Sequence, residues 1–322
     1  MFKDLKGIEK GREERKRDET ILERIIALQE VLSKLDFKEY ENTKNPELLI
    51  HKKICAMIRK ELPVYNEKDL QSFIHARANY DGEMPGIYAG CLLDVLAERN
   101  KEQGKKTRFQ IDGQGNRYDW LFGLSKNISE LIVENFKGDY ICGGIGLYGS
   151  VNLAILNNIQ GESCLINAGS FGKIKILLAN KITGKNPITH LAQAPAKIDV
   201  LLVNSVEGIG LFNGFLKRDD TPTIDLLVAR DLISIESRFV GNLPKNNEPA
   251  VNKLLYDNTR DYKKSIISKI HAKQTIYRAE TDNISYHKIF SLMDTMEGKT
   301  GTELAEIAEK IHKIYEIDIK NV

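Results

Sequence analysis

The sequence predicts an α+β protein: a central right-handed parallel β-solenoid with coils of about 23 residues, flanked by helical segments. Two observations predict this fold. A strand-like unit recurs at a regular interval in the middle of the chain, and the residues on both sides of it place apolar side chains at helical spacing. We expect an N-terminal helical domain over residues 1–104, a solenoid of five to six coils over 105–240, and a C-terminal helical segment over 241–322.

Five copies of one unit begin at residues 128, 151, 174, 198 and 224, at spacings of 23, 23, 24 and 26 residues. Positions 1, 3 and 5 of each copy are apolar, with Glu130 the one exception, and a period of two indicates a strand. Position 7 is Asn in three successive copies, where an amide suits a turn and can bond to the neighbouring copy. A unit this short buries its apolar face only by stacking on its neighbours, which predicts a solenoid.

These units resemble the right-handed parallel β-helix, or β-solenoid, repeat proteins. Their pattern is similar to the glycine-rich solenoid domains of glutamate synthase and formylmethanofuran dehydrogenase. The resemblance covers roughly residues 105–234 and implies a shared fold, with no activity carried over. Residues 105–127 match a degenerate opening coil, with Gly115 at its corner.

Positions 4 and 6 of the unit are predicted to point outward, yet they too are apolar. The resulting apolar stripe consists of Leu131, Val133, Leu156, Leu177, Leu201, Val203 and Leu227. A regular apolar face of this size is not left in water. We expect the chain's own helices to cover it, and a homodimer interface is the alternative.

Helical spacing of apolar residues marks both flanks. The expected helices cover residues 21–35, 47–62 and 86–99 before the solenoid, and 252–279 and 286–296 after it. A last helix is expected to begin at Thr300, with Glu303 at the spacing of a capping box. These helices would protect the open ends of the solenoid.

Position 2 of the unit is polar and supplies the only catalytic candidates, Lys175, Asp199 and Asp225. In-register stacking would place them about 4.8 Å apart, where two carboxylates can hold a divalent cation or share a proton. The arrangement resembles charged clusters of β-helix polysaccharide lyases and hydrolases. The favoured alternative is a surface Lys–Asp ladder that avoids like-charge stacking, so no catalytic residue is assigned.

No cofactor or metal is predicted. The segment 144–149 matches the dinucleotide fingerprint GxGxxG, but another strand follows it instead of the required helix. Cys142 and Cys164 are expected near one another on adjacent coils, with His190 in the same region. Their registers do not match a metal site, and buried apolar thiols are the favoured interpretation.

The expected helix over residues 253–278 is rich in lysine and arginine, with tyrosines between them. The candidate partner-binding residues are Arg260, Lys263, Lys264, Lys269, Lys273 and Arg278. Such a helix can contact phosphates and stack on unpaired bases, as in RNA or a ribonucleoprotein such as the ribosome. The alternative is an amphipathic helix that packs on the solenoid and leaves its lysines in water.

The composition sets the limits of the functional prediction. The chain has 322 residues, a net charge of +2 and four cysteines, which argues against a disulfide framework and against whole-molecule attraction to nucleic acid. A charged N-terminus and the lack of long apolar runs predict a cytoplasmic protein without a membrane segment. We predict a non-catalytic adaptor or assembly factor. The alternatives are a carbohydrate-active β-helix enzyme and a solenoid subunit of a larger redox enzyme.

Overall fold

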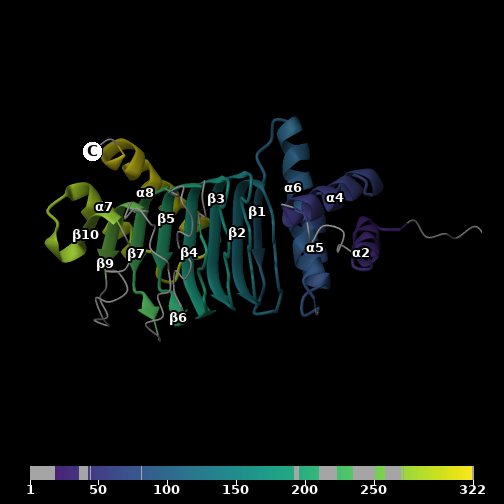
Figure 1. Cartoon of the computed structure of the whole chain (residues 1–322), viewed down its shortest axis with the longest axis horizontal. Helices are drawn as coiled ribbons and strands as arrows, with labels where there is room; N and C mark the ends of the chain where they lie inside the picture. Colours follow the sequence, from purple (N-terminus) through teal and green to yellow (C-terminus); the bar gives the residue numbers. More distant parts are fainter. Residues whose placement is uncertain are drawn as a thin grey trace, which may run out of the picture.

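The computed structural model describes residues 19–35, 43, 45–80, 82–191, 196–209, 223–234, 251–257, 270 and 272–320. A helical domain lies at one end of an elongated molecule, strands stack along its long axis, and two further helices lie alongside the strands (Figure 1). The helices are α2 (Ile21–Leu32), α4 (Pro46–Glu61), α5 (Glu67–Ala76), α6 (Met84–Glu102), α7 (Ile284–Asp294) and α8 (Gly301–Ile314), with short η2 (Arg278–Glu280) and η3 (Tyr315–Ile319). Of these, α5 was not expected from the sequence.

The central prediction, a parallel β-solenoid, is confirmed. The strands are β1 (Arg108–Asp112), β2 (Asn127–Lys137), β3 (Ser150–Gln160), β4 (Lys173–Lys185), β5 (Lys197–Asn204), β6 (Glu207–Ile209), β7 (Thr223–Arg230), β8 (Ile233–Ser234), β9 (Val251–Asp257) and β10 (Ala272–Tyr277). All pairings between them are parallel, and the main path runs β1-β2-β3-β4-β5-β7-β9-β10.

The register of the strands follows the sequence repeat. Ile128, Val151, Ile174, Ile198 and Ile224, the first residues of the five copies, pair in succession. The opening coil is present as well, although Phe109 pairs with Leu131, one residue away from the expected alignment. Strands β9 and β10 continue the ladder past residue 240, so the solenoid is longer than the five copies indicated.

The predicted inner and outer faces of the strand are exchanged. Positions 4 and 6, expected outside, lie in the solenoid interior with Cys142, Cys164 and Leu165 of the return turns. Positions 3 and 5, expected inside, form the outer face that α7 and α8 cover. Position 1 also points inward, so the alternation breaks between positions 1 and 4. Because positions 3 to 6 are almost all apolar, their sequence carries no sign of this break.

The asparagine prediction holds in one part and fails in the other. Asn180 Nδ2 donates to Asn157 Oδ1 at 2.7 Å, and Asn204 Nδ2 donates to Asn180 Oδ1 at 2.6 Å, so the amides do bond between copies. The left-handed residue of the turn is the next one along, Asn158 at φ 55° and Lys181 at φ 53°. The buried asparagines are therefore a ladder at the edge of the covered face, and the turn lies at position 8.

The helical domain closes one end of the solenoid. Buried residues of α2, α4, α5 and α6 share one continuous apolar core with the solenoid interior. A Cβ on Gly90 of α6 would collide with the backbone oxygen of Gly123, so this glycine permits the close approach of helix and coil. Asp94, also on α6, accepts hydrogen bonds from the backbone N–H groups of Lys126 and Asn127 at the start of β2.

At the C-terminal side, α7 and α8 cover positions 3 and 5 of the strands. The apolar stripe of positions 4 and 6, for which cover by helices or a second subunit was predicted, is instead buried inside the solenoid. Ile289, Phe290 and Met293 of α7 and Leu304 and Ile311 of α8 pack on positions 3 and 5 of the strands. Two local expectations were wrong. In the described chain Thr300 makes no side-chain capping bond, and residues expected in a helix over 252–279 form β9 and β10. The short runs Leu254–Tyr256 and Ile276–Tyr277 do not distinguish a strand from a helix.

Candidate functional site

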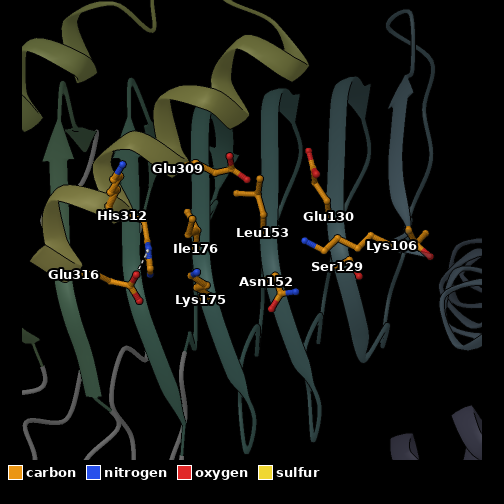
Figure 2. A pocket seen from close by; sticks show the side chains of 12 residues that line it. Lys106, Ser129, Glu130, Asn152, Leu153, Lys175, Ile176, Glu309, His312 and Glu316 are labelled. Atoms are coloured by element: carbon orange, nitrogen blue, oxygen red, sulfur yellow. Dashed lines mark ion pairs between the residues drawn. The ribbon is translucent and has the colours of Figure 1, made fainter. Parts of the chain in front are cut away.

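A polar groove lies between α8 and the outer face of the solenoid, with a volume of about 470 Å³ (Figure 2). Strands β2, β3 and β4 supply its floor through Glu130, Leu153 and Ile176, and Lys175 extends from β4 beside them. The opposite wall comes from α8 and η3: Glu309, His312, Lys313 and Glu316. The covering helix thus turns the middle of the outer face into an open groove with charged walls.

His312 is the one imidazole on this wall. Its ring is 3% exposed, and Nδ1 lies 3.7 Å from Glu316 Oε2. Burial and the nearby Lys175 lower the pKa of His312, so the ring is neutral at neutral pH. Its Nε2 has no hydrogen-bond partner among the described residues. A neutral, buried imidazole of this kind contributes packing and one free polar atom to the groove.

Two of the predicted residues of position 2, Asp199 and Asp225, are joined by a lysine that was not predicted, Lys197. Lys197 Nζ lies 3.7 Å from Asp199 Oδ1 and 3.5 Å from Asp225 Oδ2. Asp225 also accepts hydrogen bonds from Asn252 Nδ2 and from the hydroxyl of Tyr315, both at 2.8 Å. A Lys–Asp ladder is therefore present, but its lysine is Lys197 and not the predicted Lys175. Asp225 holds η3 against the strands, a structural task that occupies both of its oxygens.

The basic segment differs from its prediction. Lys253 on β9 donates to the backbone oxygen of Ile319, and Arg278 binds Asp257 and Asp294 at 2.7 Å each. Lys273 is exposed on β10. Four candidates lie outside the described residues: Arg260, Lys263, Lys264 and Lys269. Arg278 thus fastens η2 and α7 to the solenoid, with its charge already neutralised.

A second groove, lined mainly by apolar atoms, separates α7 from α8 and η3. Its volume is about 650 Å³. Ile284 and Ile317 are 71% and 66% exposed at the groove, and Leu292 and Ile314 lie between them. The rim residues with charged or ionisable side chains are His287, Lys288, Lys310, Lys313 and Asp318. An exposed apolar surface with a basic rim is a feature of protein-docking sites.

The two cysteines of the return turns behave as core residues. Cys142 and Cys164 are both buried, and burial raises the pKa of each thiol. The glycines of segment 144–149 lie in the return turn that leads into β3, so the strand expected after this segment is present. Neither cysteine belongs to a possible metal-binding group among the described residues.

One cluster escaped the sequence analysis. His51 and Cys55 of α4 and Cys91 of α6 place their ligand atoms within 4.8 Å of one another, and all three are buried. His51 Nε2 lies 2.7 Å from Asp94 Oδ2. The available signal was the spacing of His51 and Cys55, four residues apart, and of Cys91 and Asp94, three apart, since each pair shares one helix face.

Comparisons with known proteins do not identify a relative. No protein-family model, no curated protein and no solved structure matches the chain. Among the described helices, none combines the length and apolar character needed to span a bilayer.

Proposed function

We propose that this protein is a non-catalytic docking protein whose groove between α7 and α8 receives an acidic amphipathic segment of a partner protein. The observation that carries the proposal is the exposure of Ile284 and Ile317 beside three lysines. An amphipathic helix can place apolar side chains in such a groove and acidic ones against its rim. We expect the segment to be acidic because three lysines, Lys288, Lys310 and Lys313, line the groove.

The groove is held in a fixed shape by contacts with the solenoid. Arg278 joins Asp294 of α7 to Asp257 of β9, and the hydroxyl of Tyr315 binds Asp225 of β7. Lys253 of β9 holds the backbone of η3. A pre-formed site binds more tightly than one that must be ordered, because less conformational entropy is lost on binding.

Carbohydrate cleavage is supported less well. The two carboxylates that would perform it, Asp199 and Asp225, are engaged by Lys197, and Asp225 by Asn252 and Tyr315 as well. Lyase activity on an acidic polysaccharide that disappears in Asp199→Ala would restore this alternative. An RNA partner is the other outcome to be tested. It is supported less well, because Arg278, one of the residues proposed to bind RNA, is already paired with Asp257 and Asp294.

The proposal is tested by comparing two substitutions in a pull-down from native lysate, with and without RNase. Ile317→Glu places a charge in the groove, whereas Val64→Glu changes a residue that is 72% exposed in the N-terminal domain. We expect the wild type and Val64→Glu to retain the same protein, and Ile317→Glu to lose it. Equal recovery by all three chains, or recovery that RNase removes, would reject docking of a protein in this groove.

A further inference from the structure

We propose that His51, Cys55 and Cys91 bind a zinc ion that fastens the helical domain to the solenoid. This inference is independent of the proposed docking function. Thiolate sulfur and imidazole nitrogen are the ligands that zinc prefers in proteins, and two thiols with one imidazole supply three of the four positions of a tetrahedral site. A water molecule or a small thiol would take the fourth.

The distances between the ligand atoms of α4 are close to those of a tetrahedral zinc site. Cys55 Sγ lies 3.8 Å from His51 Nδ1 and 3.6 Å from Nε2. With Zn–S near 2.3 Å and Zn–N near 2.0 Å, a tetrahedral angle separates the two ligand atoms by about 3.5 Å. Cys91 extends from α6, which packs against α4, and completes the set within the same 4.8 Å.

Asp94 supplies the contact that a zinc-bound histidine ordinarily makes with its other nitrogen. If Nδ1 binds the metal, Nε2–H donates to Asp94 Oδ2 at 2.7 Å, which fixes the tautomer and the ring. The same carboxylate accepts the backbone N–H groups of Lys126 and Asn127. The zinc would therefore connect α4 to α6, and through His51 and Asp94 to the first residues of β2.

Burial argues against a catalytic thiol at this position. Cys55 is 2% exposed, and none of the residues that line the two grooves described above belongs to the cluster. A nucleophilic cysteine must be reached by its substrate, whereas a structural metal is enclosed by protein.

The test uses the full chain, purified under reducing conditions, freed of metal, and titrated with Zn²⁺ alone and with Co²⁺ alone. We expect one zinc per chain, a higher melting temperature with zinc, and the sulfur-to-cobalt charge-transfer band of a thiolate site. Cys55→Ser and Cys91→Ser should lose all three effects. Cys142→Ala, which removes a buried thiol from the solenoid, should keep them. Asp94→Asn should weaken zinc binding about 10- to 100-fold.

Three results would overturn the inference. The first is metal-free protein that takes up neither ion, and the second is a Cys55–Cys91 disulfide in a parallel preparation made without reductant, where bound zinc would have protected both thiols. The third is zinc retained by the Cys55→Ser, Cys91→Ser double variant. Should the serine variants fail to fold, the cobalt spectrum of the wild type decides alone, because a site without thiolate ligands gives no such charge-transfer band.

Discussion

Glu134 of β2 accepts a hydrogen bond from the backbone N–H of Gly301, the first residue of α8, at 2.7 Å. The same carboxylate oxygen accepts from Asn157 Nδ2 at 2.8 Å, at the start of the asparagine ladder. One buried side chain thus joins the repeat of the solenoid to the N-terminus of the helix that covers it. A negative charge at that end of a helix is stabilised by the helix dipole.

Glu134→Gln should lower the free energy of unfolding by about 1 kcal/mol, because the amide still accepts the bond but the charge is lost. Glu134→Ala should cost more, about 2–3 kcal/mol, since it leaves Gly301 N–H and Asn157 Nδ2 without their acceptor. Urea unfolding followed by circular dichroism measures both. A cost for Gln as large as that for Ala would show that the charge, and not the hydrogen bond, dominates.

Asn180→Ala should destabilise the solenoid by about 2–4 kcal/mol, because it removes the partner of Asn157 and of Asn204 inside a buried ladder. Asn152→Ala is the matched control, since Asn152 is exposed on the neighbouring strand. That change should stay within about 0.5 kcal/mol of the wild type. Similar effects of the two substitutions, measured by chemical unfolding, would contradict a stabilising role for the ladder.

The sequence was sufficient to predict the solenoid, since each coil repeats the same apolar pattern and stacking is the only way to bury it. The starts of the five copies pair as expected, from Ile128 to Ile224. The side of each strand that faces the solenoid interior was not predictable. Leu153 and Ala154, for example, are both apolar and both buried, but Leu153 lies under α8 and Ala154 lies in the interior. Only the packed helices distinguish them.

The candidate sites were less predictable than the fold. The repeat predicts that Asp199 and Asp225 stack, because both stand at position 2, but the lysine between them, Lys197, lies before position 1 and was not predicted. The groove between α7 and α8 depends on which faces of two helices remain uncovered, and that is decided by packing. The spacing within each helix places His51 with Cys55 and Cys91 with Asp94 on one face, but only the packing of α4 on α6 brings the two pairs together.

Acidification should destabilise the folded protein in part through the buried side chain of His312. Its pKa in the folded protein lies below the usual 6.5, so between the two values the unfolded chain binds more protons. The free energy of unfolding therefore falls as the pH drops below about 6.5. His312→Gln should reduce that fall. Four charged groups face the ring. Lys175 and Lys320 lower its pKa, Asp199 and Glu316 raise it, and all four are present in both chains.

The difference between wild type and His312→Gln isolates this contribution from the other titrating groups. Unfolding free energies are compared at several pH values from neutral to about 5.5, at constant ionic strength. Parallel curves for the two chains would show that His312 has the same pKa in both states.

Charge reversal at the rim of the groove should weaken partner binding. Lys310→Glu combined with Lys313→Glu replaces attraction to an acidic segment by repulsion, with an expected loss of about tenfold or more in affinity. Lys60→Glu, an exposed change on the far helical domain, is the control. Binding measured by surface plasmon resonance at two salt concentrations should also weaken with salt. A partner that binds the double variant equally well does not use this rim.

The central claim is that a partner protein occupies the groove between α7 and α8. Photo-crosslinking tests it most directly, with p-benzoylphenylalanine in place of Ile317 and, as the control, in place of Val64. The account predicts a discrete protein adduct from position 317 alone, with the crosslink mapped to an acidic amphipathic segment. No adduct at 317, an RNA adduct, or the same adduct from both positions would contradict it.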